Sequence, residues 1–175
     1  MAVPKGRAGV RPTAALVREA VFSMMTLNSD MVFIDMFAGS GIMGFTALSI
    51  GCGSAIFIDN HSQVVQGLRK SAKELGVSDR VRLWKGNVLA CFNRLKDVAT
   101  PCAVYADPPY AYSQWRPMLH KLASWLDDAA CRHVFLESNK DLQPYWPQSH
   151  CSLAPRSRRY GEKQLFILTQ QEGYP

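Results

Sequence analysis

Short apolar runs recur along the chain, and polar or glycine-containing turn residues follow each of them. Brief apolar runs bounded by turns are typical of strands that are buried on both faces of a sheet. Strands are predicted at residues 31–37, 54–60, 80–86, 102–110 and 133–138, and the fourth of them runs into a proline-rich loop.

Between these runs, apolar residues recur three and four positions apart, which is the spacing of one face of a helix. The first helix is predicted to begin at Thr13, which follows a proline and can cap the helix. Helices are predicted at residues 13–25, 41–50, 63–75, 88–95 and 114–126, with a shorter one at 142–146. Strands that alternate with helices favour right-handed crossovers and a parallel sheet.

The last part of the chain predicts a β-hairpin. Residues 150–159 and 164–169 have the pattern of two strands, and the segment RRYGEK between them contains Gly161 as a turn residue. Such a hairpin adds an antiparallel strand at the edge of the sheet. With no repeat or internal boundary, residues 1–175 are predicted to form a single domain, of which residues 1–12 are a basic N-terminal arm.

The composition predicts a packed core, because 47% of the residues are hydrophobic and only 19% are charged. No apolar run approaches the roughly 18 to 20 residues that a membrane span needs, and the N-terminus lacks the apolar stretch of a signal peptide. We therefore expect a cytoplasmic protein without a membrane partner. Five dispersed cysteines without a C-x-x-C pair predict neither a disulfide framework nor a metal site.

The net charge of +6 is compatible with a polyanionic partner. Basic residues gather near both ends of the chain, at Lys5, Arg7, Arg11 and Arg18 and at Arg156, Arg158 and Arg159. If the two ends meet in space, these side chains form one basic rim. Ordinary solvated surface charge is the alternative interpretation.

The stretch DMFAGSGIMG follows the first predicted strand. Its glycines, Gly39, Gly41 and Gly44, fit the G-x-G-x-x-G spacing of a dinucleotide-binding turn. Asp59, at the end of the second predicted strand, stands where such folds place an acid on a ribose. The turn is thus predicted to hold an adenosine-bearing molecule.

Asp35 favours one adenosine cofactor over another. Its carboxylate would repel a pyrophosphate but attract an ammonium group, and S-adenosylmethionine has an amine and no phosphate. We predict that Asp35 binds this amine, that the backbone from Gly39 to Gly41 passes the methionine part, and that Asp59 accepts hydrogen bonds from the ribose hydroxyls. A nicotinamide dehydrogenase remains the alternative.

The segment Asp107-Pro108-Pro109-Tyr110 follows the fourth predicted strand. Two prolines fix their φ angles and supply no N–H donor, which predicts a rigid loop with outward carbonyl groups. Asp107 and a loop carbonyl could accept hydrogen bonds from the amine of a nucleobase and aim its lone pair at a methyl donor. Tyr110 could stack on a flipped base. Catalysis would come from positioning and electrostatics, without a metal.

Together, DMFAGSG and DPPY resemble the class I amino-methyltransferases that act on nucleobases. The segments RPTAALVREAVFSMM (residues 11–25), DMFAGSGIMGFTALSIG (residues 35–51) and RRYGEKQL (residues 158–165) resemble, more closely, the RsmD group. That group methylates the N2 amine of a guanine in bacterial small-subunit (16S) ribosomal RNA. The resemblance extends from Arg11 to about Thr169.

The resemblance implies the class I fold, a mostly parallel seven-stranded sheet with one antiparallel strand and helices on both faces. It implies S-adenosylmethionine as cofactor, ribosomal RNA or the small ribosomal subunit as partner, and a monomer. Asn87 replaces a family Asp and can accept the adenine amine through its carbonyl oxygen. Further implied cofactor residues are Thr13, Phe37, Ser40, Asn60 and Val88. Implied RNA contacts are Lys5, Arg7, Arg11, Arg18, Arg158, Arg159 and Tyr160.

Two other functions stay open at this point. An adenine-N6 methyltransferase acting on DNA or RNA shares the DPPY segment, and pocket shape decides between the bases. The second is a non-catalytic RNA-binding protein on the same fold. It stays open because the chain has lost a Glu and an Arg of the family motif after the glycine turn, where Thr46 and Ile50 stand.

Overall fold

A computed structural model describes residues 12–98, 101–128, 131–147 and 155–169 of the chain. In this part of the chain seven strands form one sheet in the order β3-β2-β1-β4-β5-β7-β6. The parallel strands are β1 (Val32–Met36), β2 (Ser54–Asp59), β3 (Val81–Lys85), β4 (Cys102–Ala106) and β5 (Cys131–Ser138). β7 (Lys163–Thr169) runs antiparallel to both of its neighbours, β5 and the edge strand β6 (Arg156–Tyr160).

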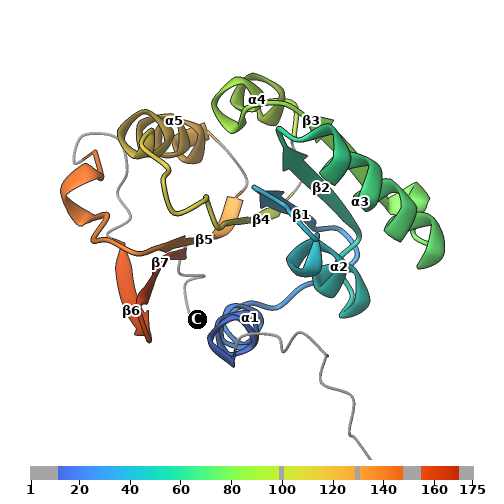
Figure 1. Cartoon of the computed structure of the whole chain (residues 1–175), viewed down its shortest axis with the longest axis horizontal. Coiled ribbons are helices and arrows are strands. Elements are labelled where there is room, and N and C mark those ends of the chain that lie inside the picture. The colour runs from blue at the N-terminus through green and yellow to red at the C-terminus, as the bar shows by residue number, and fades with distance from the viewer. Residues whose placement is uncertain (1–11, 99–100, 129–130, 148–154, 170–175) are drawn as a thin grey trace, which may run out of the picture.

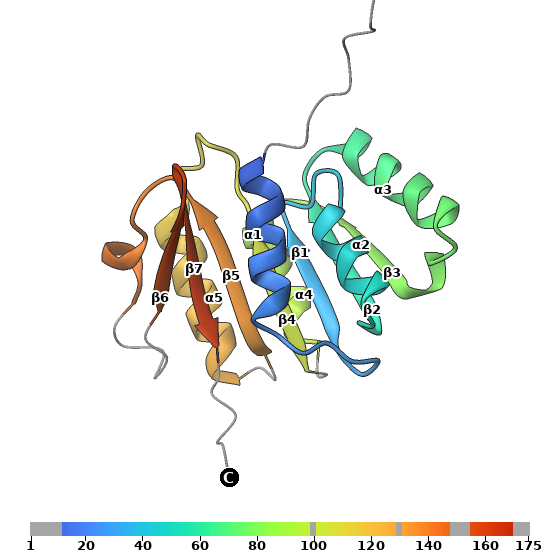
Figure 2. The same cartoon turned by 90° about the horizontal axis from the view of Figure 1, so that it is seen from below.

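Helices cover both faces of the sheet, as Figures 1 and 2 show. One face carries α1 (Pro12–Ser23), α2 (Ile42–Ser49) and α3 (Ser62–Glu74), and the other carries α4 (Val88–Leu95) and α5 (Trp115–Asp128). Short 3-10 turns, η1 (Ser78–Arg80) and η2 (Gln143–Tyr145), complete the order of elements. The predicted fold class is confirmed. None of the helices in the described ranges has the length and apolarity to cross a membrane.

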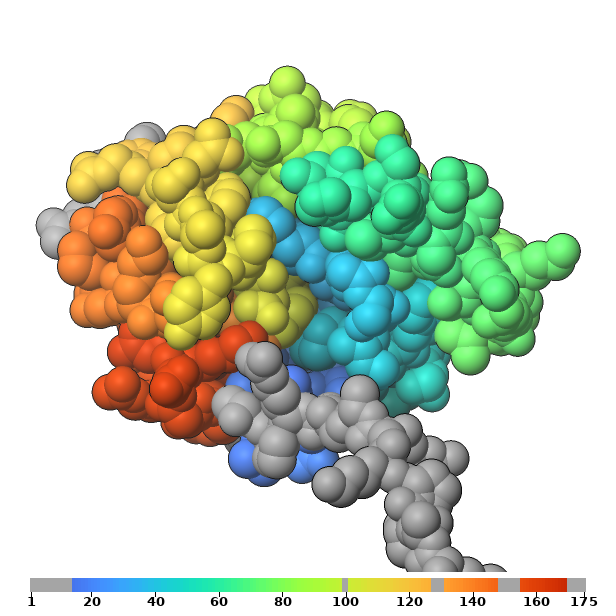
Figure 3. All heavy atoms as spheres, in the orientation of Figure 1, coloured from blue at the N-terminus to red at the C-terminus, as the bar shows by residue number. Residues whose placement is uncertain are grey.

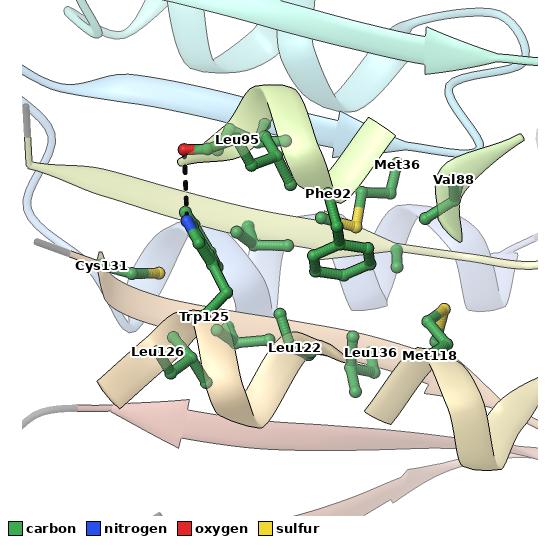
Figure 4. Close-up of a cluster of buried hydrophobic side chains, with 14 of the residues drawn as sticks. Met36, Val88, Phe92, Leu95, Met118, Leu122, Trp125, Leu126, Cys131 and Leu136 are labelled. Atoms are coloured by element: carbon green, nitrogen blue, oxygen red, sulfur yellow. Dashed lines mark hydrogen bonds between the residues drawn. The ribbon is translucent and has the colours of Figure 1, made fainter. Parts of the chain in front are cut away.

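The sheet separates two apolar layers. Beneath α4 and α5, Figure 4 shows Phe92, Leu122 and Leu136 packed together, and Trp125 closes this layer by donating from Nε1 to the Leu95 carbonyl at 3.2 Å. Strands buried on both faces supply side chains to both layers, because successive residues point to opposite sides. The continuous apolar runs of the sequence are explained by this double burial.

The strand order creates the position of a binding site. From β1 the chain moves outward to β2 on one side and returns to β4 on the other, and ligands of open parallel sheets bind where the order reverses in this way. The register pairs Met36 with Ala106. The turn after β1 therefore starts beside the loop after β4, so that the two motifs of the sequence meet.

Most predicted elements are present, with ends shifted by a few residues. The strand predicted at residues 102–110 ends at Ala106, because Pro108 and Pro109 have no N–H to donate to a ladder. The first helix ends at Ser23 and β5 begins at Cys131, two residues from the predicted limits. The strand predicted at residues 150–159 is described from Arg156 onward, and its first part lies outside the described residues.

Candidate active site

The turn after β1 has a tight, left-handed backbone. Phe37, Gly39 and Gly41 have φ angles of 64°, 51° and 75°, a region that glycine occupies at low cost and that a residue such as Phe37 occupies rarely. The Ala38 N–H donates to the carbonyl of Ile58 at 3.0 Å. This bond ties the turn to the end of β2 and brings its backbone to the carboxyl edge of the sheet.

Asp35 lies beneath this turn rather than at its surface. Its side chain is buried, and Oδ2 accepts a hydrogen bond from the Gly44 N–H at 3.1 Å. Burial, and to a lesser degree the nearby Asp107 and Asp59, raise the pKa of Asp35 to about 8, although the bond from Gly44 opposes the shift. Contact between Asp35 and a cofactor amine stays a prediction.

Gly44 serves helix packing. A Cβ atom at this position would lie 2.4 Å from a ring carbon of Phe57, a fully buried side chain of β2. Only glycine lets α2 approach the strand this closely. The third glycine of the G-x-G-x-x-G spacing is therefore used for packing and not for a phosphate.

Asp59 organises the second side of the site. Its Oδ2 accepts the Gly39 N–H at 3.1 Å, and its Oδ1 accepts the His61 N–H at 2.9 Å. The ring Nδ1 of His61 also lies 3.2 Å from Oδ1, so the second lone pair of Oδ2 is the acceptor site left for a ligand. The acid predicted to bind a ribose thus also fixes the glycine turn.

A cavity of about 450 Å³ opens between the turn after β1, the start of α3, the start of α4 and the loop after β4. In Figure 3 the loop after β4, in yellow, lies next to the turn after β1, in blue to cyan, on the face turned to the viewer. The residues that line the cavity are Phe37, Gly39, Asp59, Asn60, His61, Val64, Gly86, Asn87, Val88, Asp107, Pro109, Tyr112 and Gln114.

Most predicted cofactor residues belong to this lining. Ser40 and Gly41 do not belong to the lining, and Gly41 is buried against Leu68 and Phe45. Asn87 lines it and caps α4, because its Oδ1 accepts the Leu89 N–H at 2.8 Å. An adenine amine would have to share this oxygen.

The Asp107–Tyr110 loop separates the cavity from a small recess. The Tyr112 N–H donates to the Pro109 carbonyl at 2.8 Å and closes the loop into a turn. Asp107 and Pro109 face both spaces, whereas Pro108 and Tyr110 line only the recess. The ring of Tyr110 is 72% exposed and available for stacking.

Tyr112 was missed by the motif analysis. Its ring lies in edge-to-face contact with Phe37 and with Trp115, at centroid distances of 5.1 Å and 5.4 Å. Its hydroxyl is buried without a hydrogen-bond partner, and burial raises the pKa of Tyr112 to about 12. The Tyr112 side chain lines the cavity, whereas its hydroxyl oxygen has almost no accessible surface.

A polar network behind Asp107 was also missed. The Lys163 ammonium donates to Asp107 Oδ2 at 2.9 Å and to Glu137 Oε2 at 2.5 Å, and the Tyr105 hydroxyl donates to Glu137 Oε1. Lys163 stands in the RRYGEKQL segment and Glu137 ends an apolar strand, but neither position alone indicates this contact.

The predicted RNA contacts are placed only in part. Lys5, Arg7 and Arg11 lie outside the described residues, as does the side chain of Thr13 in α1. α1, which carries the half-buried Arg18, packs against β6. The exposed side chains of Arg158 and Arg159 lie on β6, and Tyr160 packs against the layer beneath α1. Of the first basic segment only Arg18 is described, and it lies on a helix that packs against the strand of the second.

Among the described residues, no group of three or more His, Cys, Asp or Glu side chains is placed to hold a metal ion. The described cysteines are free and buried, at positions Cys52, Cys91, Cys102 and Cys131. The site thus consists of a cavity lined by the buried Asp59, next to a proline loop that carries the partly exposed carboxylate of Asp107.

The sequence model of a family described as conserved hypothetical protein 95 matches residues 1–169. The candidate rRNA methyltransferase YlbH of Bacillus subtilis (strain 168) is 28% identical over 111 residues, which cover 62% of this chain and 60% of that protein. The match thus covers less than two thirds of the relative's own length.

Solved structures share the fold. The candidate methyltransferase yhhF of Escherichia coli superposes with a TM-score of 0.72 at 23% identity, covering 94% of this chain and 89% of that one. An RNA methyltransferase of Salinibacter ruber, solved in complex with S-adenosyl-L-homocysteine, gives a TM-score of 0.60 at 19% identity, with coverages of 99% and 97%. At these identities the likeness shows the fold alone, which is that of class I methyltransferases.

Proposed function

The chain belongs to the conserved hypothetical protein 95 family, the RsmD family that its motifs resemble, and on this premise we propose that it is an S-adenosylmethionine-dependent methyltransferase of ribosomal RNA. The observation that carries the proposal is the position of Asp107, which lines both the large cavity and the recess beside it. The recess itself, at about 20 Å³, is too small for a base. A methyl donor in the cavity and a base stacked on the exposed Tyr110 at the mouth of the recess would meet at this loop.

The cavity suits the proposed cofactor. Its volume of about 450 Å³ lies in the range typical of small-molecule sites. In this proposal Asp59 accepts bonds from the ribose hydroxyls, while Asn87 and Val88 contact the adenine. The rings of Phe37 and Tyr112, in edge-to-face contact, add an apolar wall to the cavity.

Asp107 and the prolines prepare the target amine. An exocyclic amine is a poor nucleophile because its lone pair is delocalised into the base. Hydrogen bonds from its N–H groups to Asp107 and a loop carbonyl favour a pyramidal nitrogen whose lone pair points toward the cavity. When bound, the cofactor supplies an electrophilic methyl group whose bond to sulfur breaks, leaving its electron pair on sulfur, as the bond to nitrogen forms. One proton then leaves the nitrogen, to water or to Asp107.

The finer proposal is methylation of guanine N2 in small-subunit ribosomal RNA by a cytoplasmic monomer. A guanine edge presents an N2 amine, from which Asp107 can accept a hydrogen bond. Arg158, Arg159 and Arg18, which lie on neighbouring elements, would contact RNA phosphates.

Mass spectrometry of nucleosides tests this function. The protein is incubated with labelled S-adenosylmethionine and unmethylated small ribosomal subunits, and in parallel with duplex DNA. N2-methylguanosine is expected with wild-type protein, while Asp107→Ala loses at least about a hundredfold in rate and the exposed control Asp97→Ala keeps the rate.

Each alternative function predicts a different result, in this experiment or in a binding measurement on the same proteins. Methyladenine as the only product overturns the guanine proposal. RNA binding that is unchanged in Asp107→Ala, with no methylated product from wild type, identifies a non-catalytic binding protein. Calorimetric binding of NAD without binding of S-adenosylhomocysteine identifies a dehydrogenase instead.

A further inference from the structure

We propose that Lys163 is a positioning residue, which holds one carboxylate oxygen of Asp107 so that the other faces the amine of the target base. Glu137 accepts a hydrogen bond from Lys163, and Tyr105 donates a hydrogen bond to Glu137. This inference rests on the proposed function and adds to it a residue from the edge hairpin, 56 positions away from Asp107 in the chain.

The contacts run from the sheet interior to the loop. Tyr105 of β4 and Glu137 of β5 are buried, with exposures of 6% and 3%, and the tyrosine hydroxyl donates to Glu137 Oε1. Glu137 Oε2 accepts from Lys163 at 2.5 Å, and Lys163 donates to Asp107 Oδ2 at 2.9 Å. Lys163 is thus held by buried side chains of β4 and β5.

The ammonium of Lys163 balances the charge of two carboxylates, those of Glu137 and Asp107. A buried carboxylate without a counter-charge is costly, and Lys163 supplies a positive charge to Glu137 and Asp107 together. Burial alone would lower the pKa of Lys163, but its bonds to the two carboxylates keep the pKa above the ordinary value. The ammonium therefore stays charged and acts as a fixed hydrogen-bond donor rather than as a base.

The geometry assigns the two oxygens of Asp107 different tasks. Oδ2 is engaged by Lys163, which leaves Oδ1 for the amine of a bound base. The Asp107 side chain is 40% exposed, so that without this bond it could rotate toward solvent. Since small displacements of a positioning group cost large factors in rate, a fixed carboxylate matters more than a merely ionised one.

A purely structural role is the competing explanation, because Lys163 also neutralises the buried Glu137. The two roles differ in what Lys163→Met does to a folded enzyme. A structural role lowers the melting temperature and leaves the kinetics of the remaining folded protein unchanged. A positioning role lowers kcat for methyl transfer and leaves the binding of S-adenosylhomocysteine unchanged.

The test compares wild type, Lys163→Met, Lys163→Arg and the exposed control Lys70→Met on α3. For Lys163→Met we expect kcat to fall about 10- to 100-fold, with the Kd for S-adenosylhomocysteine within about twofold of wild type. Lys163→Arg, which keeps a charged donor, should lose less in kcat than Lys163→Met, and Lys70→Met should match wild type.

A double variant completes the experiment. If Lys163 acts through Asp107, Lys163→Met should slow the Asp107→Asn enzyme less than about twofold, since residues that act as a unit are not additive. Wild-type kinetics in folded Lys163→Met, or full additivity, overturns the proposal. If Lys163→Met does not fold, Lys163→Gln replaces it, and wild-type kinetics in that folded variant overturns the proposal. Absence of methyl transfer by wild type would instead overturn the proposed function.

Discussion

The backbone N–H of Gly39 donates to Oδ2 of Asp59 at 3.1 Å, across 20 positions of sequence. This bond joins the ends of two neighbouring parallel strands, at the edge where the cavity opens. The acid expected to bind a ribose is therefore also a support of the turn, and substitutions at Asp59 should affect the ligand and the fold together.

Replacing Asp59 by Asn tests the predicted contact between this side chain and the ribose. The amide keeps one oxygen but turns an NH₂ toward the N–H of Gly39 or of His61, so one donor loses its acceptor. Calorimetry should show an S-adenosylhomocysteine affinity about 10- to 100-fold weaker than wild type. The exposed acid Asp79 provides the control, as Asp79→Asn should bind normally. Normal binding by Asp59→Asn would contradict a ribose contact.

Removing the Tyr112 hydroxyl should have different effects on the stability of the protein and on its affinity for the ligand. Because it is buried without a partner, Tyr112→Phe should leave the ligand-free protein as stable as wild type or up to about 1 kcal/mol more stable. If the hydroxyl binds the ligand, the same variant should lose about 5- to 10-fold in affinity for S-adenosylhomocysteine. Thermal melts with and without ligand measure both, and an unchanged affinity would show that the hydroxyl makes no ligand contact.

Gly44→Ala tests the packing of α2 on the sheet. The added Cβ would meet the ring of Phe57 at 2.4 Å, and overpacking of this kind costs about 1 to 3 kcal/mol of unfolding free energy. Urea titration gives this value, and Phe57→Leu in the same chain should restore part of it. The control is Gly67→Ala in α3, where an added Cβ has open space. This substitution should raise the free energy of unfolding by about 0.5 to 1 kcal/mol.

Asp35 should make stability depend on pH. Its pKa is raised from 3.8 to about 8, so between these values the folded state holds a proton that the unfolded chain releases. The stability contributed by this group is complete below the lower value and is lost as the pH rises toward the upper one. Its slope is at most about 1.4 kcal/mol per pH unit.

Asp35→Asn removes the titrating group and retains an acceptor for the Gly44 N–H. Urea unfolding of both proteins between about pH 5 and about pH 8 should show a shallower decline for the variant. If the two proteins lose stability with pH at the same rate, Asp35 does not change its protonation state in this pH range. The same series above the upper value should show no further difference in slope.

Local patterns in the sequence determined the elements and the two turns. The apolar runs predicted the five parallel strands because burial on both faces leaves no polar alternation, and Pro108 and Pro109 predicted a loop because they have no N–H. Gly39 and Asp59 were found because their motif is contiguous with strand ends, where a parallel sheet places its ligands.

Tertiary structure decided which of these residues face the cavity and what supports them. Asp35 belongs to the motif but is buried under the turn, while Tyr112 belongs to no motif and lines the cavity. Lys163 reaches Asp107 because β7 inserts between β5 and β6, and this order is set by packing of the whole sheet. Contacts between residues that are distant in sequence depend on strand order and register, which the periodicity of a single strand does not encode.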